Sequence, residues 1–285
     1  MTKFCHALQR ALPLKLRLTR GSGWFAAVLM ATTLPAFSAP FEVALSPSRF
    51  EVSVKSAGRL GQSINLFNLG NQVTDVSVRT LDWTYSEDGN ITYHDELLPD
   101  SCRPWVTLER KTVRLVPMGK SSFRFQIDVP ADAPRGECRL MLAVEGVEPA
   151  YQAQLQGGGA SLNLPISGRI AVAVYINVNG AQPKLEIKQL GVKSLNGKPT
   201  PVITVSNSGD AHARLEGGLE AVDAQNQKFD LIPEGTPILP GQTRTLPFVP
   251  RVVTNEKPIQ ITLPLKAQGQ LDWDLGSFKI DAEFK

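Results

Sequence analysis

Apolar residues occupy every second position from residue 160 to residue 180, ASLNLPISGRIAVAVYINVNG. Those with even numbers are Leu162, Leu164, Ile166, Ile170, Val172, Val174, Ile176 and Val178, and only Gly168 interrupts the register. Strict alternation indicates a β-strand, in which successive side chains point to opposite faces. Strands are usually about 5–6 residues long. The pattern therefore predicts one strand of about 17 residues, too long for a single sheet.

The same alternation continues along the chain. The segments FEVALSPSRFEVSV, VTDVSVRTLDWTY and KTVRLVPMGKSSFRFQIDV alternate, and turn signals such as SEDGN separate them. No sustained helical period of 3.6 residues occurs after the N-terminal segment. We therefore expect an all-β fold, and the many short strands are typical of immunoglobulin-like sandwiches.

A loose internal repeat predicts two such sandwiches. SINLFNLGN is followed by RLVPMGKSSFRF in the first half, and VITVSNSGD is followed by PILPGQTRTLPF in the second. Each unit has a strand ending in Asn-x-Gly and a later Pro/Gly turn that leads into a strand. We expect an N-terminal sandwich over residues 39–179 and a smaller C-terminal one over residues 180–285, joined at NGAQP.

The first 38 residues are expected to be a signal peptide. They contain five basic residues and no acidic one, and the apolar run WFAAVLMATTLPAF follows the basic part. This run is shorter than the roughly 20 residues that a membrane-spanning helix needs. Ala36-Phe37-Ser38 fits the small-x-small rule for cleavage. We predict cleavage between Ser38 and Ala39, export to the periplasm, and no membrane insertion after cleavage.

Charge and cysteine content change when this segment is removed. The remaining chain has 25 basic and 27 acidic residues, a net charge of −2, so no basic field favours nucleic acid. Cys102 and Cys138 are the two cysteines left. A pair in an exported chain indicates a disulfide, and two unpaired buried thiols are the alternative.

Motifs of catalysis are missing from the sequence. It has no Gly-x-Ser-x-Gly elbow, no phosphate-binding loop before a helix and no His-Glu-x-x-His. His94 and His212 stand in no recognisable catalytic setting, and the polar segment DGNITYHDE is interpreted as a solvated hairpin. Trp83 and Trp105 are interpreted as anchors of the core. We therefore expect no enzyme, no cofactor and no metal site.

The order of motifs resembles that of the PapD-like periplasmic pilus-assembly chaperones, in a divergent branch. The similar segments are LSPSRFEVSV, INLFNLGN, PWVTLERKTVRLVPMGKSSFRF, DVPADAPRGECRLML, a loop over residues 147–160, SGRIAVAVYINV, VSNSGDAHARLEG and ILPGQTRTL. They cover most of the chain after residue 38.

This resemblance implies donor-strand complementation. In that mechanism a chaperone lends an edge strand to pilin-like subunits and delivers them to an outer-membrane usher. Leu162, Leu164 and Ile166 would be the lent side chains. Two basic residues would hold the terminal carboxylate of the subunit.

The first of these basic residues is Arg49. Ala171 occupies the position of the family's lysine, and Arg169 is the nearest substitute. The alternative function is a secreted two-domain immunoglobulin-like protein for adhesion or cell-surface interaction.

Overall fold

The computed structural model describes residues 41–86, 89–147, 151–157, 160–166, 168–251 and 259–285, with the backbone alone for 151–157 and 160–166. The predicted signal peptide and its cleavage point lie outside these ranges. In the described ranges every regular element is a strand except one 3₁₀ turn, η1 (Arg103–Trp105), which confirms the predicted all-β fold. No helix there has the length and apolarity of a membrane span.

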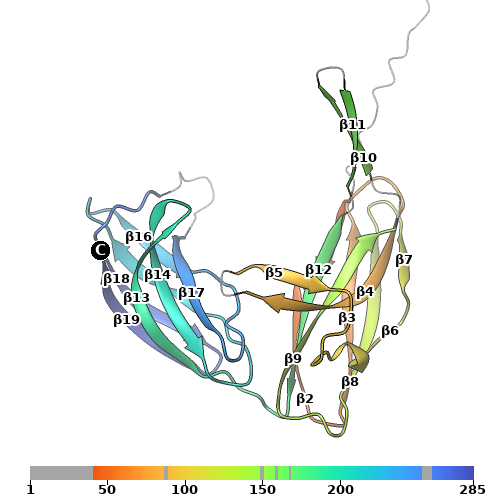
Figure 1. The fold of residues 1–285 in the computed structure, drawn as a ribbon, viewed down its shortest axis with the longest axis horizontal. Helices are drawn as coiled ribbons and strands as arrows, with labels where there is room; N and C mark the ends of the chain where they lie inside the picture. The colour runs from red at the N-terminus through yellow and green to blue at the C-terminus, as the bar shows by residue number, and fades with distance from the viewer. Residues whose placement is uncertain (1–40, 87–88, 148–150, 158–159, 167, 252–258) are drawn as a thin grey trace, which may run out of the picture. The chain divides into compact units, whose positions relative to one another are not determined.

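Two sheets form the N-terminal part of the described chain (Figure 1). The four-stranded sheet has the order β1 (Val43–Ser46), β3 (Arg59–Asn68), β8 (Lys120–Asp128) and β6 (Val106–Leu108). The six-stranded sheet has the order β2 (Arg49–Val54), β12 (Arg169–Val178), β9 (Gly136–Gly146), β4 (Thr74–Tyr85) and β5 (Ile91–His94), and β7 (Thr112–Leu115) pairs with β4.

The core between these sheets is built from alternate residues of their strands. From β12 it takes Val172, Val174, Ile176 and Val178, the even positions of the sequence pattern, which are at most 1% exposed. Phe50 of β2 and Phe125 of β8 meet edge to face, with ring centroids 5.1 Å apart. The even face of β12 is therefore the core face, as the alternation predicts.

The first strand segment is shared between both sheets. β1 pairs with β3 in an antiparallel arrangement, and after Pro47 the chain enters β2, which pairs in parallel with β12. Proline lacks the N–H that a sheet ladder needs, so it suits the point where the chain leaves one sheet for the other.

The prediction of a single strand over residues 162–178 was wrong. β11 (Ala160–Ile166) ends before Gly168, and β12 begins at Arg169. The loop expected over residues 147–160 also contains a strand, β10 (Tyr151–Gly157), which pairs with β11 as a separate two-stranded sheet (Figure 1).

Phe41 explains why residue 168 is a glycine. A Cβ at residue 168 would clash with the Phe41 side chain, and one at Gly146 would lie 3.4 Å from the Phe41 ring. Gly146 N–H donates to the carbonyl oxygen of Gly168 at 3.4 Å. The aromatic ring thus lies over a pair of glycines, and a side chain at residue 168 would displace it.

Seven strands form the C-terminal part. The sheet has the order β13 (Leu185–Leu195), β14 (Lys198–Asn207), β17 (Thr243–Pro250), β16 (Lys228–Pro233), β15 (Glu216–Val222), β18 (Leu265–Trp273) and β19 (Gly276–Phe284). The first half of β17 pairs with β14 and its second half with β16, so this strand connects the two layers. Phe248 and Phe284 are at most 1% exposed in the enclosed core.

Two buried asparagines give the internal repeat a structural basis. Asn68 and Asn207 are each 1% exposed and end equivalent strands, β3 and β14. Each side-chain amide donates to the carbonyl four residues later, at 2.7 and 2.8 Å, and each side-chain oxygen accepts from the glycine N–H two residues later, at 2.9 Å. The Asn68 amide also donates to the carbonyl of Leu115, and the Asn207 amide donates to the carbonyl of Ile238. The Asn-x-Gly motif therefore encodes the same turn twice.

The segment between β12 and β13 contains the expected junction. β12 ends at Val178, and Asn179 and Gly180 have the positive φ values of a tight turn, 55° and 70°. Asn179 accepts from Ser56 N–H at 3.0 Å and donates to Ser56 Oγ at 2.7 Å. The division into domains at residues 179 and 180 stays a prediction.

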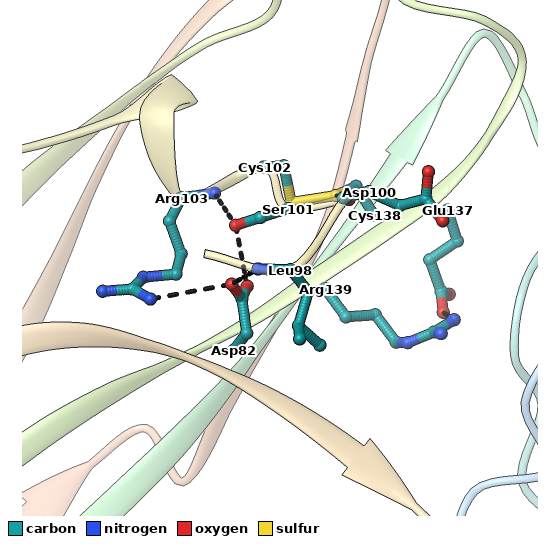
Figure 2. Close-up of a disulfide and its surroundings, with 9 residues drawn as sticks. All are labelled: Asp82, Leu98, Asp100, Ser101, Cys102, Arg103, Glu137, Cys138 and Arg139. Atoms are coloured by element: carbon teal, nitrogen blue, oxygen red, sulfur yellow. Dashed lines mark hydrogen bonds and ion pairs between the residues drawn. A yellow bond between two sulfur atoms is a disulfide. The ribbon is translucent and has the colours of Figure 1, made fainter. Parts of the chain in front are cut away.

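The predicted disulfide is present. Cys102 and Cys138 are bonded with their Cα atoms 6.1 Å apart (Figure 2). The bond ties the segment before η1 to β9. Trp83 and Trp105 are both packed in apolar clusters, as expected of core anchors.

Candidate functional site: a charged sheet face and a strand hairpin

The second face of the six-stranded sheet, opposite its core face, carries charged and aromatic side chains. The parallel register sets Arg49 beside Ala173 and Glu51 beside Tyr175. β9 continues the row, because Arg139 pairs with Tyr175. Since residues alternate along each strand, these side chains share one face.

His212 contacts this face from the segment between β14 and β15. Its ring stacks on Tyr175 with centroids 3.9 Å apart. Its Nδ1 lies 2.5 Å from Glu137 Oε2, and its backbone N–H donates to the same oxygen at 3.0 Å. Nε2 lies 3.6 Å from Glu51 Oε1. The imidazole is therefore held between two carboxylates and against an aromatic ring.

Arg214 also contacts Tyr175. Its guanidinium donates to the Tyr175 hydroxyl at 3.1 Å and to the carbonyl of Gly235 at 2.8 Å. Its Nε lies 3.9 Å from Glu51 Oε1. Glu51 is consequently surrounded by cationic groups, which favour its ionised form.

The protonation equilibria reflect this arrangement. Interactions with His212, together with the hydrogen bond from Arg49, lower the pKa of Glu51 to about 2, although burial acts in the opposite direction. Burial alone would lower the pKa of His212, but the contacts with Glu137 and Glu51 outweigh it and raise that pKa above 6.5. Burial raises the pKa of the Tyr175 hydroxyl. The contacts therefore favour a charged imidazole between two carboxylates.

Arg49 is the most accessible cation of the group. It donates to Glu51 Oε1 at 2.6 Å, and its side chain is 46% exposed. It borders a hollow of about 300 Å³, which Asp272 and Trp273 also line. A guanidinium has five N–H donors, so donors remain for an incoming carboxylate.

Arg169 lies apart from Arg49. Arg49 pairs with Ala173, and Ala173 is four positions from Arg169 on β12, a distance of about 13 Å along the strand. Arg169 instead forms an ion pair with Glu145, which also binds Arg79 at 3.0 Å. The structure does not bring the two predicted anchor arginines together, and their role stays a prediction.

Small and apolar side chains separate the two arginines. Ala171 and Ala173 pack at the border of a buried cluster that consists of Leu81, Trp83, Tyr85, Met141, Ala143, Tyr175 and Leu239. Where the resembled family has a lysine, this sheet face has an alanine on an apolar floor.

The hairpin of β10 and β11 contains the residues expected to be lent. Its backbone register places Leu162 opposite Leu155, Leu164 opposite Ala153 and Ile166 opposite Tyr151. β11 has β10 as its one strand partner in the described ranges. The side chains of these residues lie outside the described part.

Sequence reasoning missed Glu51, Glu137, Tyr175, His212 and Arg214. One signal was available: Glu51 follows Arg49 by two positions, so both had to share a strand face. His212 comes from a segment about 160 residues further along the chain, and no local pattern predicts that it meets this face.

In the ranges that the structure describes, no three metal-binding side chains gather into a site. Within the polar segment, residues 91–94 form β5, in which His94 pairs with Asp82 in register. Asp95 makes an ion pair with Arg79.

No protein-family model and no curated protein matches the chain. Several chaperones are among the solved structures to which it is similar. The YadV chaperone is 11% identical at a TM-score of 0.45, over 85% of this chain and all of that one. The E. coli chaperone DraB is 15% identical at a TM-score of 0.42, over 86% of this chain and 97% of that one.

A third similar structure is the Salmonella enterica SafA pilin in complex with the SafB chaperone. It is 13% identical at a TM-score of 0.43, over 85% of this chain and 97% of that one. Each of these three structures contains a chaperone.

Proposed function

We propose that the chain is a periplasmic chaperone that binds subunits of pili or related surface fibres by lending them strand β11, and that it delivers them to an outer-membrane usher. The observation that carries the proposal is the separate β10–β11 sheet, in which β11 has one paired edge in the described ranges. A strand edge with unpaired N–H and C=O groups is a template for another chain. The proposed activity is binding, without catalysis.

The alternation of the sequence supports this role. Leu162, Leu164 and Ile166 are separated by two positions each, so they share one face of β11. A subunit that lacks a strand would receive alternate side chains of the added strand in its pockets. Backbone hydrogen bonds would provide affinity, and the three apolar side chains would provide register.

Arg49 is the better supported of the two proposed anchors. It is exposed and lies on the sheet face that β12 shares with β2. A carboxylate bound there would form a charge-assisted hydrogen bond with the guanidinium. Arg169 would contribute at a second point, about four strand positions away.

The test is capture of subunits from periplasmic extract by the tagged full chain in its native host, with mass spectrometry of the captured proteins. We expect Leu164→Glu to lose these subunits and to keep its melting temperature, because a charge would enter an apolar groove of the partner. The matched control is Leu97→Glu, since Leu97 is an exposed leucine outside the hairpin.

Two outcomes would contradict the proposal. A large fall in the melting temperature of Leu164→Glu, without a specific loss of capture, would place Leu164 in the core of the protein itself. Display of the wild-type chain on the cell surface, with no subunit captured, would favour the adhesion protein instead.

A further inference from the structure

β4 and β9 begin as neighbours in the six-stranded sheet and then separate. Residues 76–81 of β4 pair with residues 141–146 of β9. From Asp82 onward β4 pairs with β5, while residues 136–140 of β9 have β12 as their one strand partner in the described ranges. Two strand edges thus diverge and leave an opening in the sheet.

A cavity of about 810 Å³ lies at this opening. Its lining includes Trp83 of β4, Arg139 of β9, Trp105 of η1 and Pro240. The volume falls in the range of sites that bind small molecules and peptides, roughly 300–1,000 Å³. Trp105 and Pro240 provide apolar surface on which an extended chain can lie.

One wall of the cavity is fixed in place by a buried carboxylate and the disulfide (Figure 2). Asp82 accepts from Leu98 N–H at 3.0 Å and from Ser101 Oγ at 2.8 Å. The Cys102–Cys138 bond then joins this segment to β9. A wall tied to both diverging strands holds the opening in a defined shape.

A buried donor in the lining lacks an acceptor. Trp83 is 8% exposed, and its Nε1 has no hydrogen-bond partner in the described ranges. Leaving such a group unpaired is unfavourable, so an acceptor brought by a ligand would be bound in preference to an apolar group. A peptide carbonyl oxygen has the required chemistry.

The charges of the lining are mostly negative. Asp82, Asp100, Glu137 and Asp210 contribute carboxylates, against the single guanidinium of Arg139. Glu137 is paired with Arg139 at 3.2 Å, Asp82 with Arg103 at 3.6 Å and Asp210 with Arg135 at 2.7 Å, which leaves Asp100 as the carboxylate of the lining without an ion pair in the described ranges. A ligand with basic side chains complements this lining better than an acidic one.

We propose that this cavity binds an extended basic peptide segment of a partner protein. The segment adds its backbone to the open edge of β9 and gives a carbonyl oxygen to Trp83 Nε1. The site is separate from β11, so it stands or falls independently of subunit capture.

The probe is a fluorescein-labelled peptide of alternating valine and lysine, six residues long and amidated, with its valine–glutamate analogue as the charge control. Fluorescence anisotropy with the full chain should show saturable binding of the basic peptide, with a dissociation constant below about 1 mM. Binding of the acidic peptide should be at least about 10-fold weaker, since the charges repel. Absence of saturation, or equal binding of both peptides, would overturn the proposal.

Trp83→Phe tests whether the peptide binds in this cavity, because the substitution removes the indole N–H and keeps an aromatic ring. We expect a dissociation constant about 5- to 10-fold higher, the effect of one hydrogen bond. The control is Leu69→Ala, an exposed apolar side chain outside the lining, which should bind like the wild type. Thermal melting should show that both proteins are folded. If Trp83→Phe then binds the peptide as tightly as the wild type, the peptide binds elsewhere and the proposal is overturned.

Discussion

The two faces of strand β12 come from one stretch of sequence, yet they are held by different forces. On the core face, Val172, Val174 and Ile176 are at most 1% exposed and pack among aliphatic and aromatic side chains. On the other face, Tyr175 stacks on His212, and Arg169 forms an ion pair with Glu145. Close packing fixes the apolar side chains of the core in one arrangement. Ion pairs in contact with water contribute little to stability, so their side chains can exchange partners with a small change in free energy. The second face is thus suited to binding.

The largest effect is expected from a charge on the core face. Val174→Asp would bury a carboxylate without a partner at a position that is 0% exposed. We expect a loss of more than about 4 kcal/mol in the free energy of unfolding.

The control for this variant is Ala173→Asp, the neighbouring residue on the second face. It pairs in register with Arg49, which can compensate the new charge. The free energy of unfolding of Ala173→Asp should be within about 1 kcal/mol of the wild-type value. Urea unfolding of both variants compares the faces directly, and equal losses would remove the distinction.

The disulfide should have the next largest effect, because Cys102 is fully buried on the core face. Replacing both cysteines by serine opens a loop of 36 residues and should lower the free energy of unfolding by about 3–4 kcal/mol on the chain-entropy model. Urea midpoints with and without a reducing agent measure this. The wild type should show no thiol that reacts with a labelling reagent when it is denatured without reduction, and two labelled cysteines would contradict the bond.

On the second face, the contacts of His212 should make stability depend on pH. The pKa of His212 is raised in the fold, so its contribution is complete below about pH 6.5 and is lost as the pH rises through the raised value. The pKa of Glu51 is lowered to about 2, so its contribution is present above pH 4.5 and is lost as the pH falls toward 2.

His212→Gln tests this dependence. Between pH 6 and pH 8 the wild-type free energy of unfolding should fall toward that of the variant, because deprotonation removes the charge that the two carboxylates stabilise. Chemical unfolding at a series of pH values gives the comparison. A constant difference over this range would mean that His212 acts by packing alone.

The smallest effect on stability is expected at Arg49. The ion pair between Arg49 and Glu51 is largely exposed, so Arg49→Ala should change the free energy of unfolding by less than about 1 kcal/mol. If the proposed function holds, the same variant should lose subunit capture in the periplasmic pull-down, because the carboxylate anchor is gone. Arg169→Ala is the parallel variant, and normal capture by both would rule out the proposed anchor.

The alternation of the sequence predicted the all-β fold and the core residues of β12, because burial on one face imposes a period of two. It could not predict that β11 ends at Ile166 and that β12 begins at Arg169. It also could not explain the glycine at residue 168, because the ring of Phe41 that fills this space comes from far away in sequence. β10 was missed for a related reason, since its segment reads as a loop before a glycine-rich turn.

The candidate site was less predictable than the core. Arg49 stood out through a motif, but Glu137, Tyr175 and His212 come from three separate segments and meet only after folding. Each of them is ordinary in its local sequence. A charged side chain on a strand indicates that this face of the strand is exposed. It does not indicate which distant residue will contact the charged group.

The parallel pairing of β2 with β12 has a consequence for the order of folding. Arg49 and Ala173 become neighbours only when about 120 residues have been closed into a loop, which costs entropy before any contact compensates it. Contacts between such distant segments slow folding. We therefore expect the six-stranded sheet to gain its edge strand late, after local hairpins such as β13–β14 have formed. Until β2 pairs, the edge of β12 that it covers would be open to pairing with another molecule.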